Sequence, residues 1–183
     1  MATNEEIKKL HEQLDALLGN TDLTDVSAEG PGFSELPDGY YNCEVESAEL
    51  KMSKSSGQPM ASFKFKVTEN GYSAQIDDKQ NVHLKEIAKT KGRVFFIHYV
   101  LKNDTWVKRF VTDMLKFEGS TPGESLLPKE AFIASETIED ALDLLIGKRI
   151  YVQVSTTTND DDTESIWKNL ISWKRAAALE LPM

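Results

Sequence analysis

The stretch that decides the fold is residues 36–67, LPDGYYNCEVESAELKMSKSSGQPMASFKFKV. A Pro-Asp-Gly turn at 37–39 opens it, and a basic, Ser- and Gly-rich loop over 52–60 divides it into two halves. In both halves apolar residues alternate with polar ones, which is typical of a strand with one buried face. The predicted buried face consists of Tyr41, Cys43, Val45, Phe63, Phe65 and Val67. The folded core therefore begins here, as two half-buried strands joined by a flexible loop.

Two segments after this stretch differ sharply in polarity. Residues 92–101, GRVFFIHYVL, are apolar at nearly every position, which predicts a strand buried on both faces or at an interface. Residues 73–91 are polar and weakly patterned. They predict a long loop that could include a short helix around 84–89.

Helical periodicity follows in two places. Over 105–119, apolar residues recur at helical spacing and Gly119 ends the run. A second helix is predicted over 137–145, with Thr137 and Asp140 as its capping pair.

The final segments, 149–157 and 165–173, predict a hairpin with an acidic turn at 159–162. Strands without βαβ alternation predict a mainly β fold with inserted helices, arranged as an antiparallel barrel or sandwich.

The N-terminal 19 residues predict an amphipathic helix, with Thr3 and Glu6 as a capping box and Gly19 as a stop. Its apolar stripe consists of Ile7, Leu10, Leu14 and Leu17. Two heptads are too short to be stable alone, so the helix should dock on the domain, a sister subunit or another protein. Residues 20–36 predict an acidic linker, 37–175 the β domain and 176–183 a C-terminal tail.

Composition indicates an ordinary globular protein. The 183 residues are 40% hydrophobic and 28% charged, and their apolar runs are too short to span a bilayer. The first residues lack the basic and apolar regions of a signal peptide. A single cysteine excludes an intrachain disulfide framework and a multi-cysteine zinc site. These features predict a cytoplasmic protein without a membrane partner.

The net charge of −9 is unevenly distributed. Residues 1–36 carry two basic and eight acidic side chains, whereas residues 89–117 carry seven basic and two acidic ones. Acidity is therefore concentrated at the N-terminus and in short loops, and the middle of the chain is basic. The overall charge argues against nucleic acid as a ligand but does not exclude it.

The sequence lacks the motifs of catalysis. It has no nucleophile elbow, P-loop, Rossmann glycine pattern or His-Glu-x-x-His. The three histidines lie in different contexts, and the acidic turn at 159–162 lacks the spacing of a calcium loop. We therefore expect no enzyme activity, no cofactor and no metal.

Cations and aromatic residues that could hold a nucleic acid strand recur through the β domain. Binding of single strands without sequence preference needs cations near the phosphates and flat side chains on which bases stack. Tyr151 would point outward if Ile150 and Val152 point inward. Such lysines more often only solvate a strand, such aromatics are more often core, and Glu44 and Glu46 would repel phosphates. The candidates are Lys51, Lys54, Lys64, Lys66, Lys108, Arg109, Arg149, Tyr151, Trp167 and Lys168.

The order of elements in 36–67 resembles a family of bacteriophage single-stranded-DNA-binding-like proteins. The shared pattern is the Pro-Asp-Gly turn, a long strand, a Ser-Lys-x-Ser-Gly-x-Pro-Met loop and an alternating Phe/Lys strand. It continues more loosely through residues 92–96, 106–119 and 147–154. The resemblance implies an OB-fold barrel that coats single-stranded DNA in phage replication or recombination, without sequence preference and without catalysis. It also implies a location in the host cell cytoplasm.

A different class of function stays open beside this one. The acidic N-terminal segment and its apolar stripe also fit an acidic phage-encoded interaction protein, an inhibitor or adaptor. Such a protein would bind a host protein through the N-terminal helix or an acidic surface. The helix could equally mediate self-association or bind a replication protein.

Overall fold

The computed structural model describes residues 3–20 and 36–183, and the chain divides into two compact units, Met1–Glu35 and Leu36–Met183. In the first unit the predicted helix is confirmed as α1 (Asn4–Gly19). Its capping box is also confirmed, because the Glu6 backbone N–H donates to the Thr3 hydroxyl and the Thr3 N–H donates to the Glu6 carboxylate at 2.7 Å. The side chains of the predicted apolar stripe are between 41% and 65% exposed. The predicted linker over 20–36 lies, apart from its end residues, outside the described residues.

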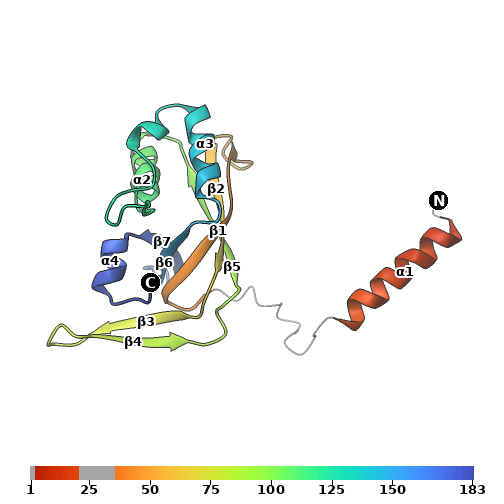
Figure 1. Ribbon diagram of the computed structural model, residues 1–183, viewed down its shortest axis with the longest axis horizontal. Helices are drawn as coiled ribbons and strands as arrows, with labels where there is room; N and C mark the ends of the chain where they lie inside the picture. The colour runs from red at the N-terminus through yellow and green to blue at the C-terminus, as the bar shows by residue number, and fades with distance from the viewer. Residues whose placement is uncertain (1–2, 21–35) are drawn as a thin grey trace. The chain divides into compact units, whose positions relative to one another are not determined.

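The second unit is built around one antiparallel sheet (Figure 1). Within the described ranges this sheet has seven strands, which confirms the prediction of a mainly β fold with a few helices. Its elements are, in order, β1 (Gly39–Met52), β2 (Pro59–Val67), β3 (Gly71–Ile76), β4 (Val82–Ile87), β5 (Val94–Val100), α2 (Asp104–Met114), the 3-10 helix η1 (Lys129–Phe132), α3 (Ser135–Leu145), β6 (Arg149–Thr158), β7 (Glu164–Ile171) and α4 (Trp173–Ala178).

Strand β1 is the centre of the sheet because it pairs with three other strands. Its residues 43–52 pair with β2, its residues 39–44 pair with β6, and Tyr40 pairs with Tyr72 of β3. A β-bulge between Val45 and Ser47 shifts the register with β2, and bulges bend a strand and increase its twist. Beyond these pairs, β5 adds to β2, β4 adds to β3 and β7 adds to β6.

The sheet does not close into a barrel. Among the described strands, β5 pairs only with β2 and β7 pairs only with β6. Strands β4, β5 and β7 are therefore edge strands of the sheet, and residues of β5 and β7 line a common groove. We call the unpaired boundary between β5 and β7 the seam. The coarse prediction of an antiparallel sheet with inserted helices is confirmed, whereas the closed barrel is not observed.

The alternation in 36–67 produces the core as predicted. All six residues of the predicted face are buried, as are side chains from the two helices that follow β5. Phe110 and Met114 of α2, and Leu142 and Leu145 of α3, pack with them in one cluster. The helix over 137–145 thus exists with its buried face. Its cap is different from the predicted one, because Ala134 is the N-cap and the Thr137 hydroxyl donates to the Ala134 carbonyl.

Of the two alternatives predicted for residues 92–101, strand β5 excludes burial on both faces, whereas burial at an interface stays a prediction. Phe95 and Tyr99 are buried, whereas Val94 and Phe96 are about half exposed. Alternate residues of a strand face opposite sides of the sheet, and only the inner side of β5 packs on the core. Within β5 itself nothing marks Phe96 as exposed, because its two neighbours in the chain, Phe95 and Ile97, are also apolar.

The polar segment after residue 70 corrects a second prediction. It forms the β3–β4 hairpin, paired over six residues, in place of a loop with a short helix. Asn70 orders the base of the hairpin, since its side-chain oxygen accepts from the backbone N–H groups of Thr90 and Lys91. The hairpin extends beyond the rest of the sheet (Figure 1), so few of its side chains enter the core and its apolar signal is weak.

The C-terminal residues form a second, smaller cluster. Ala176, Leu179 and Leu181 are buried against Tyr40 and Tyr151 on the side of the sheet opposite the main core. Residues 176–183, predicted as a tail, thus contribute packed side chains. In the described part of the chain, every helix is too short or too polar to cross a membrane.

Candidate functional site

The outward sides of β1, β2 and β5 form one exposed surface, which we call the open face. The register places Lys64 beside Phe96, Ser62 beside His98 and Lys66 beside Val94. On the other side of β2, Lys66 pairs with Glu44 and Ser62 with Glu49. Because paired residues of an antiparallel sheet share a face, cations, carboxylates and aromatic rings are mixed within three adjacent strands.

Two aromatic rings lie side by side on the open face. The rings of Phe96 and His98 are 6.0 Å apart between centroids, with an interplanar angle of 12°. Phe96 is 53% exposed. His98 is held in place because its Nδ1 lies 2.9 Å from the Ser62 hydroxyl oxygen. Burial, and secondarily the positive charge of Lys51, lower the pKa of His98. The imidazole is therefore mostly neutral near pH 7, and the pair forms a flat apolar platform.

Two of the three lysines of the open face form ion pairs with glutamates, and Glu44 stands beside the third, Lys66, in the strand register. Lys64 Nζ lies 3.0 Å from a Glu46 oxygen, and Lys51 Nζ lies 3.1 Å from a Glu49 oxygen. Lys66 is exposed and makes no ion pair with any described residue. Exposed pairs of this kind contribute little, about 0–1 kcal/mol, so an anionic ligand could displace them at small cost.

A groove of about 220 Å³ lies at the seam between β5 and β7, with α2 as its third wall. We call it the β5–β7 groove. Three of its residues, Trp106, Arg109 and Asp113, come from one face of α2 because they are spaced three and four residues apart. The complete lining is Phe96, Ile97, His98, Tyr99, Trp106, Arg109, Asp113, Ile166 and Lys168.

Cations lie over aromatic rings at this groove. Arg109 Cζ is 5.4 Å from the centroid of the Trp106 ring, and Lys102 Nζ is 4.9 Å from the same centroid. Lys168 Nζ is 5.7 Å from the centroid of Phe95. These distances are within the range of cation–π attraction. The rings hold the basic groups without neutralising their charge.

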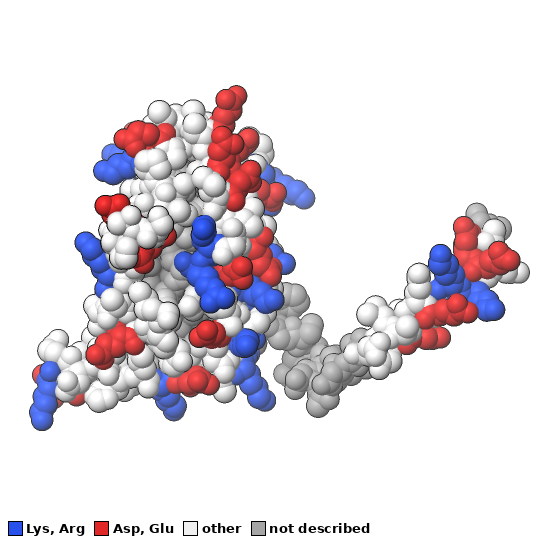
Figure 2. All heavy atoms as spheres, in the orientation of Figure 1, with Lys and Arg blue, Asp and Glu red and all other residues white. Residues whose placement is uncertain are grey.

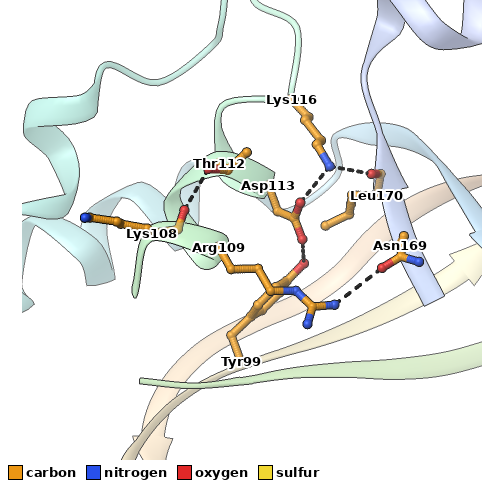
Figure 3. A network of polar contacts seen from close by, with 8 residues as sticks. All are labelled: Tyr99, Lys108, Arg109, Thr112, Asp113, Lys116, Asn169 and Leu170. Atoms are coloured by element: carbon orange, nitrogen blue, oxygen red, sulfur yellow. Dashed lines mark hydrogen bonds and ion pairs between the residues drawn. The ribbon is translucent and has the colours of Figure 1, made fainter. Parts of the chain in front are cut away.

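A polar network runs through the wall of the groove, and its centre, Asp113 with Tyr99, is buried (Figure 3). Both oxygens of the buried Asp113 carboxylate are occupied, by the Tyr99 hydroxyl at 2.7 Å and by Lys116 Nζ at 2.7 Å. Lys116 also donates to the Leu170 carbonyl at 2.7 Å, and Arg109 donates to the Asn169 side chain at 3.4 Å. Helix α2 therefore connects β5 to β7 across the seam through side chains.

The network perturbs the titration of Tyr99. Burial raises the pKa of its hydroxyl well above the usual value, and the adjacent Asp113 carboxylate raises it further. Tyr99 therefore stays protonated and keeps its hydrogen bond throughout the neutral range.

Five of the ten predicted binding residues lie at these two surfaces. Lys51, Lys64 and Lys66 are on the open face, and Arg109 and Lys168 line the β5–β7 groove. Lys54 lies in the loop that joins β1 to β2, next to the end of the open face. Lys108 points away from Arg109 and from the polar network (Figure 3).

The other predicted residues are placed differently. Arg149 and Tyr151 border a separate cavity beside α4. Tyr151 points away from the main core as predicted, but α4 and the C-terminal residues cover it and leave it 7% exposed. Its hydroxyl donates to the Pro182 carbonyl, so its ring is not available for stacking. Trp167 is 47% exposed, and its Nε1 donates to the Thr157 hydroxyl at 2.9 Å.

The sequence reasoning missed three aromatic residues of the site, Phe96, His98 and Trp106. Phe96 and His98 belong to the apolar run 92–101, which predicts a strand buried on both faces or at an interface, and Trp106 is one of the apolar residues that recur at helical spacing. One signal for an exposed side of β5 was available. On the neighbouring strand Lys64 and Lys66 alternate with apolar residues, which indicates that this side of the sheet faces solvent. An adjacent strand in the same sheet must share that exposed side.

Charges of both signs are mixed on the face of the second unit that Figure 2 draws. On the face drawn in Figure 2, basic and acidic side chains alternate and neither sign forms a broad uniform area. Among the described residues, no group of three or more His, Cys, Asp and Glu side chains is placed to hold a metal ion.

One family match accompanies this geometry. Residues 19–95 are similar to a family described as a protein of unknown function (DUF669). The match covers less than half of the chain and runs from the end of α1 into the start of β5. A comparison with curated proteins finds no match.

Proposed function

We propose that this protein binds single-stranded DNA on the open face, without catalysis and without sequence preference. The observation that carries the proposal is the exposed Phe96–His98 platform directly beside Lys64 and Lys66. Stacking platforms flanked by cations are the arrangement that sequence-tolerant binding of single strands needs. The resemblance to phage single-stranded-DNA-binding-like proteins suggests a role in phage replication or recombination in the host cytoplasm.

The strand connections support an OB-like domain for this function. Strands β1, β2 and β5 are neighbours in the sheet, with the β3–β4 hairpin inserted in the chain between β2 and β5. Helices follow β5, and the β6–β7 hairpin returns to pair with β1. Two sets of contacts cross the seam. Phe95 of β5 lies under Lys168 of β7, and further along both strands Tyr99 is linked to Leu170 through Asp113 and Lys116. The residue numbers rise together on the two strands, so β5 and β7 run in the same direction. We infer an OB-like barrel that α2 bridges at an open seam. The second and third strands of OB-folds carry the oligonucleotide, and in the proposed barrel β2 and β5 would correspond to these two strands.

Binding would combine stacking with phosphate neutralisation. A base stacked on Phe96 would contribute roughly 1–3 kcal/mol. Phosphates beside it would replace Glu46 as the partner of Lys64 and give Lys66 a partner. Release of counterions from the strand would make the affinity fall steeply with salt.

The test is a titration of fluorescent oligo-dT at two salt concentrations. We expect tight binding at low salt that weakens as salt rises. Phe96→Ala should weaken it roughly fivefold to a hundredfold, and Lys64→Glu/Lys66→Glu should abolish it. The matched control is Lys79→Glu/Lys85→Glu, which makes the same charge change on the exposed β3–β4 hairpin and should have a much smaller effect. Absence of binding by the unmodified protein at low salt would refute the proposal.

A second candidate function is an interaction protein that binds a host protein. The exposed Ile7, Leu10 and Leu14 side chains of α1 favour it, as does the acidity of residues 1–36. The two proposals differ in what removal of the first unit does to activity.

A further inference from the structure

We propose that the β5–β7 groove receives one unstacked nucleobase together with its phosphate, so that the bound strand leaves the open face across the edge of β5. This inference rests on the proposed function and adds a second subsite to it. Phe96 and His98 carry the argument because they belong to both surfaces. A base stacked on this platform is therefore adjacent to the mouth of the groove.

The side chains of the groove match the two chemical parts of a nucleotide. Phe96 and Trp106 offer flat apolar surfaces, and basic side chains come from two walls, Arg109 from α2 and Lys168 from β7. A purely apolar ligand would leave the Arg109 guanidinium without a charged partner, and a simple inorganic anion would leave the rings unused. The volume of about 220 Å³ is below the roughly 300–1,000 Å³ of sites for drug-sized ligands, so the groove suits a single small planar group.

Arg109 is positioned before any ligand arrives. Its guanidinium lies against the Trp106 ring and donates to Asn169 at the long distance of 3.4 Å. A phosphate oxygen would provide a stronger, charge-assisted hydrogen bond than this neutral amide. The Trp106 contact can persist while the guanidinium turns to the phosphate, so the ordering cost is small.

The Asp113 carboxylate in the groove repels an anionic ligand less than an unpaired carboxylate would. Both oxygens of Asp113 accept hydrogen bonds, from Tyr99 and from the positively charged Lys116. The ion pair with Lys116 balances its charge locally. Asp113 therefore supports the walls of the groove, and the positive charge of Arg109 faces its mouth.

Helix α2 provides a matched pair of variants for the test. Arg109→Gln and Lys108→Gln remove the same charge from adjacent residues, but only Arg109 lines the groove. We expect Arg109→Gln to weaken oligo-dT binding and to lower the salt slope by about one, whereas Lys108→Gln leaves the slope nearly unchanged. Trp106→Ala should weaken binding roughly fivefold to a hundredfold. Trp106→Phe, which keeps a ring, should restore most of the affinity, and thermal melts would show that each variant is folded.

Photocrosslinking with oligonucleotides that carry 5-iodouracil gives an independent readout on the full chain. We expect mass spectrometry to find crosslinks at Trp106 as well as at Phe96 or His98. If Lys64→Glu/Lys66→Glu abolishes binding while Arg109→Gln and Trp106→Ala bind like the unmodified protein, the groove subsite is refuted and the open face stands. Crosslinks confined to β2 and β5 would refute it in the same way. If the unmodified protein binds no oligonucleotide, both proposals fall.

Discussion

At the scale of single residues, Asp113 is the side chain on which the seam depends. It is buried, and its two oxygens tie Tyr99 of β5 to Lys116, which in turn holds β7. A buried carboxylate that loses one of its partners keeps its desolvation cost. The hydroxyl of Tyr99 therefore matters more to stability than an average exposed hydroxyl.

We predict that Tyr99→Phe lowers the free energy of unfolding by about 1–3 kcal/mol, because one Asp113 oxygen loses its buried donor. Urea denaturation followed by tryptophan fluorescence measures the change. The control is Tyr72→Phe, since the Tyr72 hydroxyl makes no hydrogen bond with any described residue. Equal stability of the Tyr99→Phe variant and the unmodified protein would show that the network contributes nothing.

Buried tyrosines also predict a specific response to alkali. Burial raises the pKa of Tyr41 and of Tyr151 to about 12, and it raises the pKa of Tyr99 as well. Between pH 10 and about 12 these hydroxyls ionise in the unfolded chain but stay protonated in the folded one. The unfolded state then binds fewer protons, so the free energy of unfolding should fall as pH rises through this window. Denaturation series at successive pH values measure it, and a flat profile would contradict the assignment.

At the scale of elements, the sequence predicted best where one side of a strand is buried and the other is not. The alternation in β1 and β2 reports their two environments directly, and the capping box of α1 is fully local. Strand β5 has the same two environments, but Val94 and Phe96 are apolar on the exposed side. Exposure of an apolar side chain depends on which elements pack over it, and that information is not local.

The β3–β4 hairpin was missed for the opposite reason. Its strands are held by backbone pairing and by polar contacts such as those of Asn70, with few buried side chains. Hydrophobic periodicity is therefore weak there although the backbone is regular.

For the candidate site, the lysines of β2 were predictable from alternation. The groove was not, because it joins residues from β5, α2 and β7 that only the fold brings together.

At the scale of the whole molecule, the two units should separate functionally. Residues 36–183 contain both hydrophobic clusters and all the proposed binding residues. We predict that a protein lacking residues 1–35 retains the oligonucleotide affinity of the full chain. In the full chain, Leu10→Asp/Leu14→Asp should leave that affinity unchanged and should remove any self-association or binding to a protein partner.

Light scattering and the oligo-dT titration measure these two outcomes on the same samples. A large loss of oligonucleotide affinity in both variants would show that α1 belongs to the nucleic-acid interface. Unimpaired association of the Leu10→Asp/Leu14→Asp variant would remove the apolar stripe as a docking surface.

The single cysteine has a practical consequence for all of these measurements. Cys43 is buried within β1, and burial raises the pKa of its thiol, so it is poorly reactive toward alkylating reagents. A cysteine introduced on the surface would consequently be the one accessible thiol of the chain. Dyes or spin labels can then be attached at one chosen point, for example at Ile166 on the rim of the groove, while the native cysteine is left in place.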